Sequence, residues 1–177
     1  MSSSVSFHSL KLNDLKSLIG SKRGDIKDRL IGDDPEGSQF IDQLIDEGNI
    51  DGIDYYPAYL LEFVNHENID DSWANQAYWD LIEKLVTNPE VNQELTDLLS
   101  YITEGRRVTD GERFHQMGDQ YETTVGYWTV EEIKKLKELL NNLDKSFLGD
   151  LGRVVDSLKL VCKKTIEKNE DVFFVSA

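Results

Sequence analysis

The sequence predicts an α+β fold, in which residues 1–177 form one mostly helical domain with a small sheet that includes strands at both chain ends. The first observation is the alternation of apolar and polar residues over 5–10, which is the period of a half-buried strand. The second is the apolar run over 171–175, which is typical of a buried strand. The third is the helical spacing of apolar residues through most of the intervening chain. An arrangement of helices over one small sheet accounts for all three.

Four helices are predicted before residue 70. Apolar spacing predicts one over 12–19, which ends at a glycine, and a shorter one over 24–31. Ser38 is expected to cap a third helix, and Pro57 fits the first turn of a fourth. The buried side of the third helix is predicted to carry Phe40, Ile41, Leu44 and Ile45.

Four more helices are predicted after residue 70. Asp71 or Ser72 is expected to cap the first, and a second begins after Pro89. Thr129 and Glu132 have the spacing of a capping box, in which each side chain satisfies a free backbone N–H at the start of a third helix. The fourth leads to the C-terminal strand. The buried stripe of the first of these helices is predicted to be Ala74, Ala77, Tyr78, Leu81 and Leu85.

The negative charge of the chain is large and unevenly placed. The formal net charge is −15, and the stretch between Arg29 and Lys84 contains 14 acidic residues with no lysine or arginine. Such a surface repels nucleic-acid backbones and anionic membranes, so neither is expected as a partner. It attracts basic proteins and speeds their encounter. A charge of this size can also serve only to keep a protein soluble.

Aromatic residues in the same cation-free stretch are candidates for anchors of a protein interface. Two tyrosines follow the acidic loop over 48–54, and Trp79 is predicted to point away from the buried side of its helix. Carboxylates would supply long-range attraction, and the rings would supply short-range affinity. The predicted partner-binding residues are Asp33, Asp34, Glu36, Asp42, Asp46, Glu47, Asp51, Asp54, Tyr55, Tyr56 and Trp79.

No pattern in the sequence indicates a catalytic, metal or cofactor site. The histidines at positions 8, 66 and 115 stand alone rather than at the spacing of metal ligands. The single cysteine, Cys162, falls on the apolar side of a predicted helix, which favours a buried structural thiol over a nucleophile. We therefore expect a non-enzymatic protein that uses neither a metal nor a cofactor.

Three features favour a cytoplasmic location. A single cysteine cannot form an internal disulfide, which favours a reducing compartment. No apolar run reaches the length of a membrane span. The first residues show no cationic region followed by an apolar one, so no secretory signal is expected.

The segment over 104–127 is the main alternative site. It is punctuated by glycines and carries Arg106, Arg107, Arg113 and His115. These side chains could line an anion pocket in a small-molecule-binding or enzymatic domain. The preferred interpretation is that they pair with acidic residues elsewhere in the protein. A segment of this length contains a hairpin or is a functional loop.

Three segments resemble the YfbM-like family of small bacterial proteins of unknown function. Residues 79–85, WDLIEKL, resemble a tryptophan-bearing helix of that family, and residues 127–133, YWTVEEI, resemble its aromatic–Thr–x–Glu–Glu helix start. The third is the last helix with the strand over 172–175, and the three segments occur in the family's order. Val130 stands where the family tends to place proline. The resemblance implies an α+β domain and no activity, because the family offers no catalytic motif to carry over.

These observations lead to the hypothesis of a cytoplasmic inhibitor that blocks a basic protein. An immunity protein or antitoxin against a nuclease-like or other nucleic-acid-processing toxin fits best, because such toxins have cationic clefts that a carboxylate-rich surface can occupy. An inhibitor that mimics nucleic acid belongs to the same physical class. The alternatives are a small-molecule-binding or enzymatic domain with its pocket at 104–127, and an acidic domain with no dedicated basic partner.

Overall fold

The computed structural model describes residues 4–113 and 123–177, and its centre is a four-stranded antiparallel sheet in the order β2–β1–β4–β3. The two inner strands come from the ends of the chain, β1 (Val5–Leu10) and β4 (Asp171–Ser176). The edges are β2 (His66–Asp70) and β3 (Thr124–Trp128). The predicted α+β fold, with both terminal strands in one small sheet, is therefore confirmed.

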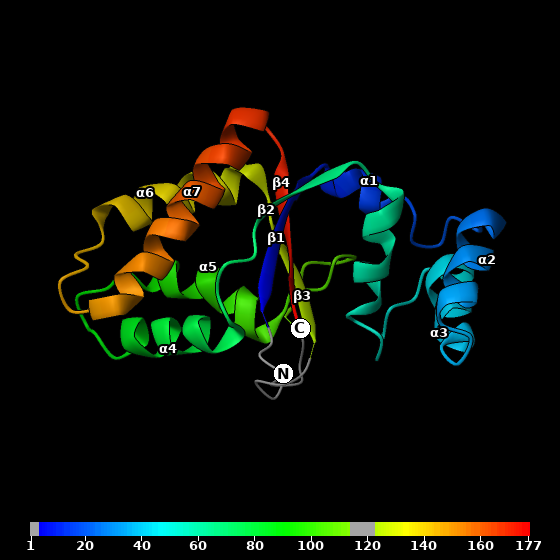
Figure 1. Cartoon of the computed structure of the whole chain (residues 1–177), viewed down its shortest axis with the longest axis horizontal. Coiled ribbons are helices and arrows are strands. Elements are labelled where there is room, and N and C mark those ends of the chain that lie inside the picture. Colours follow the sequence, from blue (N-terminus) through cyan, green and yellow to red (C-terminus); the bar gives the residue numbers. More distant parts are fainter. Residues whose placement is uncertain (1–3, 114–122) are drawn as a thin grey trace.

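The sheet is buried on both faces, because alternate residues of its inner strands enter two different apolar clusters. Phe7 stands opposite Phe174 in the register of β1 and β4, and both pack in the first cluster. Phe173 and Leu10 point to the other face and pack in the second. The sheet thus forms the middle layer between two groups of helices (Figure 1).

The first helix layer covers one face of the sheet with α4 (Asn75–Val86), α5 (Gln93–Glu104), α6 (Val130–Asn142) and α7 (Gly152–Lys168). A short 3₁₀ turn, η3 (Gly149–Leu151), leads into α7. Trp128 is fully buried beneath this layer, its indole N–H donates to the carbonyl of Leu98 at 2.9 Å, and its ring packs on Phe174. The predicted capping box at the start of α6 is confirmed.

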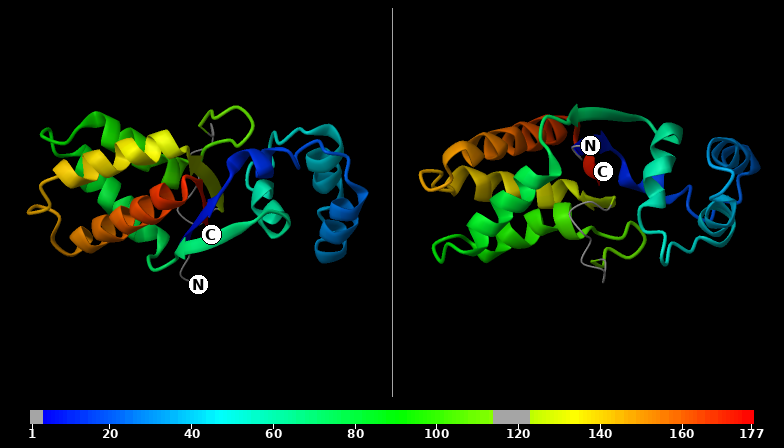
Figure 2. Two further views of the ribbon diagram at one scale, coloured as in Figure 1. Left: turned by 90° about the horizontal axis from the view of Figure 1, so that it is seen from above. Right: turned by 60° about the horizontal axis from the view of Figure 1, so that its bottom comes forward.

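The second helix layer lies on the opposite face of the sheet (Figure 2). It consists of α1 (Leu12–Lys16), α2 (Gly24–Asp33), α3 (Ser38–Asp42) with its π-helical continuation η1 (Gln43–Glu47), and the 3₁₀ helix η2 (Tyr56–Phe63). Two glycines in left-handed conformation bring α1 and η1 together. A Cβ on Gly20 would lie 3.1 Å from the Cα of Gly48, so a side chain there would force the two turns apart.

Two local predictions are wrong, because the residue at the N-cap of the helix differs from the expected one. Gly37, not Ser38, is the N-cap of α3, and Ala74 rather than an acidic or serine residue precedes α4. Pro57 lies in the first turn of η2, as predicted, and that helix is of the 3₁₀ type. Strand β2 was not predicted, because it is an edge strand in which only Ile69 is buried.

Candidate functional site

A groove in the second helix layer is the best-formed candidate site, with a volume of about 670 Å³. It lies between α2, α3 and η2 and extends to the first residue of β2. Four apolar residues, three carboxylates, a tyrosine and a histidine line it: Leu30, Ile41, Ala58, Leu61, Asp33, Asp34, Glu62, Tyr59 and His66. Its volume is within the range of ligand pockets. We call it the acidic groove.

The 3₁₀ geometry of η2 places two tyrosines on the same side of the helix, and burial distinguishes them. In a 3₁₀ helix, side chains three residues apart lie above one another. Tyr56 and Tyr59 accordingly contact each other, with ring centroids 5.2 Å apart. Tyr56 is buried, with 4% of its surface exposed, and supports Tyr59, which is 45% exposed. A tyrosine with this much exposed surface on a buried support is a preorganised contact for a ligand.

Each of the three groove carboxylates has a partner within the protein. Asp34 accepts a hydrogen bond from the backbone N–H of Gly37 at 3.0 Å and from the hydroxyl of Tyr56 at 3.5 Å. Burial first, and then neighbouring tyrosines and Asp34, raise the pKa of Tyr56, so its hydroxyl remains a donor. Asp33 pairs with Arg29 at 3.4 Å, and the same guanidinium lies 4.0 Å from Glu62. Arg29 is therefore the cation nearest to two groove carboxylates.

A series of hydrogen-bonding groups behind the acidic groove connects Ser6, His8 and His66. Ser6 donates its hydroxyl to the carbonyl of Val175 at 3.4 Å, so its oxygen accepts from His8 Nε2–H at 3.0 Å. The unprotonated Nδ1 of His8 then accepts from His66 Nδ1–H at 3.2 Å. Burial, followed by the proximity of His66, lowers the pKa of His8 to about 4, which keeps the His8 ring neutral.

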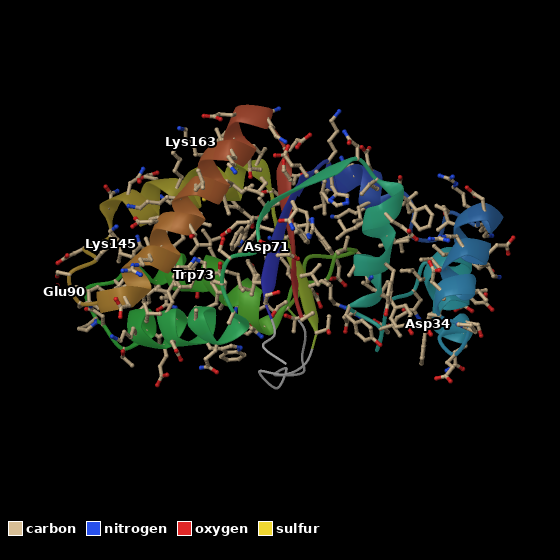
Figure 3. The ribbon with its side chains drawn as sticks, in the orientation of Figure 1. Asp34, Asp71, Trp73, Glu90, Lys145 and Lys163 are labelled. Atoms are coloured by element: carbon tan, nitrogen blue, oxygen red, sulfur yellow. The ribbon has the colours of Figure 1, made fainter. Side chains whose placement is uncertain are left out.

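The structure brings part of the predicted acidic set to one side of the molecule. Asp33 and Asp34 line the acidic groove, and Figure 3 shows Asp34 in the second helix layer. Glu36, in the turn after α2, and Glu47, at the end of η1, are exposed. Asp42 and Asp46 also lie on this layer, where both pair with Lys27, at 2.8 and 2.6 Å.

Cations from later in the chain pair with part of the acidic stretch. Arg107 pairs with Asp51 and with Asp54, the latter at 3.0 Å, and Lys168 pairs with Glu67. These contacts join residues more than 50 positions apart, which no local pattern indicates. Asp51 and Asp54 are therefore already neutralised in part by the protein itself.

Two of the predicted aromatic anchors, Tyr56 and Trp79, are not among the residues that line the acidic groove. Tyr56 is buried, so it supports the groove rather than contacting a partner. Trp79 is half-buried and lies on α4, in the first helix layer, across the sheet from the acidic groove. Tyr55 is 38% exposed and packs against the ring of Tyr56 at 4.9 Å. Tyr59, within the same stretch, is the exposed ring that the sequence reasoning did not select.

Glu62 and His66 were also missed as site residues. Glu62 belongs to the counted acidic stretch, and its distance of three residues from Tyr59 indicates a shared face once the helix is known to be 3₁₀. His66 gave no signal, because its partner His8 is 58 residues away.

The arginines of the 104–127 segment are engaged internally, as the preferred interpretation predicted. Arg106 lies between the rings of Tyr101 and Tyr127, at 4.5 and 4.3 Å, and pairs with Glu132 at 2.8 Å. Arg107 has the carboxylate partners given above. Arg113 pairs with Glu104. His115 lies outside the described residues.

The described residues contain no sign of a reactive thiol, a metal site or a membrane-spanning helix. Cys162 is buried, as predicted, and burial raises the pKa of its thiol to about 12. Over residues 4–113 and 123–177 there is no group of three or more histidine, cysteine, aspartate or glutamate side chains that could hold a metal ion. No helix in these ranges has the length and apolar character needed to cross a membrane.

Comparison with known proteins leaves the acidic groove as the main guide to function. The resemblance to the YfbM-like family stays a prediction. The chain matches no protein-family model, no curated protein and no solved structure.

Proposed function

We propose that the protein binds a basic protein partner through the acidic groove and thereby inhibits it. The observation that carries the proposal is the lining of the groove. Three carboxylates and an exposed tyrosine surround an apolar floor, and no lysine or arginine is among the lining residues. Carboxylates attract a cationic side chain, and the floor accommodates its aliphatic stem.

The placement of acidic residues supports this orientation. Lys145 and Lys163 lie in the first helix layer, away from Asp34 (Figure 3). Residues 30–63, which form much of the second helix layer, carry nine acidic residues and no lysine or arginine, so together with the formal net charge of −15 they attract a basic protein toward that layer.

Inhibition follows if the basic surface of the partner is its substrate site. A nuclease-like toxin binds phosphate through a cationic cleft, and a carboxylate-lined surface seated there excludes the nucleic acid. An immunity protein or antitoxin is the function that fits best, and an inhibitor that mimics nucleic acid would use the same contacts. A cytoplasmic location belongs to this proposal, supported by the single buried thiol.

Quantitative capture from host extract with two matched variants tests the proposal. The first carries Asp33→Asn, Asp34→Asn and Glu62→Gln in the acidic groove. The control carries Asp80→Asn, Asp150→Asn and Glu83→Gln at three exposed carboxylates of the first helix layer. Each variant removes three negative charges, which takes the formal net charge from −15 to −12.

The proposal predicts one basic protein that the wild type and the control retain and the groove variant loses. The wild-type protein should then inhibit the nucleic-acid-processing activity of that partner at equimolar ratio. Equal loss with both variants would mean that net charge, not the groove, is responsible. A captured partner without a basic surface would also refute the proposal.

A further inference from the structure

Arg29, the cation nearest to two carboxylates of the acidic groove, indicates what the groove binds. Arg29 reaches from α2 to Asp33 and Glu62, on two different helices, and its side chain is 61% exposed. We propose that the groove receives a single arginine side chain of the partner, and that Arg29 occupies part of that site and competes with it. This inference rests on the proposed function and specifies the ligand chemistry of the same groove.

The groups around the groove suit a guanidinium better than an ammonium. A guanidinium has five N–H donors in a planar fork, matches carboxylates in pairs, and stacks on aromatic rings. The groove offers three carboxylates, the exposed ring of Tyr59 and the imidazole of His66. A lysine ammonium would use the charge but not the ring or the planar geometry.

The same chain already uses this combination elsewhere. Arg106 is held between two tyrosine rings and pairs with Glu132 at 2.8 Å. The groove presents a similar set of groups, one ring and several carboxylates, without a stacked guanidinium. Arg29 meets the carboxylates, but among the described contacts it is not stacked on Tyr59. An incoming arginine would gain the contact with the ring.

Arg29 should therefore weaken binding of an arginine ligand. Its ion pairs are exposed, and exposed pairs are individually weak, so a ligand can displace it. Removing it leaves Asp33 and Glu62 without their nearest cation. Arg23 is the matched control, because it precedes the same helix, is also exposed, and pairs with Asp25 at 2.5 Å, outside the groove.

The test is titration of the ¹⁵N-labelled full chain with the capped peptide Ac-Gly-Arg-Gly-NH₂, followed by NMR. The variants are Arg29→Gln and Arg23→Gln, which lower the net charge equally. We expect the affinity of Arg29→Gln to exceed that of the wild type by about two- to fivefold, and that of Arg23→Gln to stay within about twofold. The amide shifts should centre on Ala58, Tyr59 and His66. Melting temperatures of both variants are measured to confirm that they are folded.

Two further peptides make the ligand class specific. The neutral isostere with citrulline in place of arginine should not bind, and the lysine peptide should bind more weakly than the arginine peptide. Equal gains in the two variants would show a bulk charge effect and overturn the inference. Lower affinity in Arg29→Gln, equal binding of the lysine peptide, or shifts centred elsewhere would also overturn it.

Failure here is distinguishable from failure of the proposed function. If the peptide does not bind but the captured basic protein still depends on Asp33, Asp34 and Glu62, the groove is an interface that does not take a single arginine. If the peptide binds in the groove and no basic protein is captured, the ligand chemistry stands and the inhibitory function fails.

Discussion

Replacing His8 with glutamine should remove much of the acid sensitivity of the fold. His8 is buried on β1, and burial is the main cause of its low pKa of about 4, against an ordinary value of 6.5. The proximity of His66 lowers it further, and Asp71 opposes the shift. In the unfolded chain, His8 binds a proton as the pH falls through 6.5, while the folded protein leaves it neutral. The contribution of His8 therefore lowers the free energy of unfolding progressively as the pH falls from 6.5 to about 4. Above pH 6.5, His8 has no such cost.

The size of the effect at pH 5 follows from the difference between the two pKa values. At that pH the unfolded chain is about 1.5 pH units below its ordinary pKa of 6.5, and the folded protein is still above its own. At about 1.4 kcal/mol per unit, the loss is at most about 2 kcal/mol. Solvent access to part of the ring reduces this to roughly 1–2 kcal/mol.

Urea unfolding of the wild type and the His8→Gln variant at pH 7.5 and pH 5.0 measures this quantity. A glutamine amide can still donate to Ser6 or accept from His66, so the variant keeps a polar contact at the site. Carboxylates titrate alike in both proteins, so the difference between their two losses isolates His8. The wild type should lose about 1–2 kcal/mol more than the variant. Equal losses would refute the reasoning.

Three further substitutions or reactions test the packing. Arg106→Met should lower the free energy of unfolding by about 2 kcal/mol in urea titration, because Glu132 loses its partner in a half-buried site. An unchanged free energy of unfolding would mean that this ion pair does not stabilise the fold. Gly126→Ala should cost about 1–3 kcal/mol and lower the melting temperature, because the new methyl group would lie 2.6 Å from Cζ of Phe174; an unchanged melting temperature would contradict the register of β3. Cys162 should react with a thiol reagent far more slowly in the native protein than in denaturant, and labelling at equal rates would contradict its burial.

The parts of the fold that could be predicted are those with a local signal. The alternation in β1, the apolar run of β4 and the capping box at Thr129 each lie within a few residues and are confirmed. The edge strand β2 carried no such signal, because its exposed residues need not alternate. Its pairing with β1 joins residues about 60 positions apart, such as His8 and Asn68.

The candidate site was predictable in composition and not in geometry. The acidic, aromatic stretch contains Asp33, Asp34, Tyr59 and Glu62, but choosing Tyr59 over Tyr56 required knowing which of the two rings the rest of the protein buries. Trp79 was placed correctly off the buried stripe of its own helix, yet the helix packs on the opposite face of the sheet. The face of the sheet on which a helix packs depends on tertiary contacts, which the periodicity of the helix does not determine.

Site-specific photo-crosslinking tests the central claim most directly. p-Benzoylphenylalanine is introduced at Tyr59 in one variant and at Trp79 in another, and the cells are irradiated before lysis. Both positions accept an aromatic side chain, but only Tyr59 lines the acidic groove. The account predicts a crosslink to one basic protein from Tyr59 and none to that protein from Trp79. A crosslink to the basic partner from Trp79 and not from Tyr59 would contradict it.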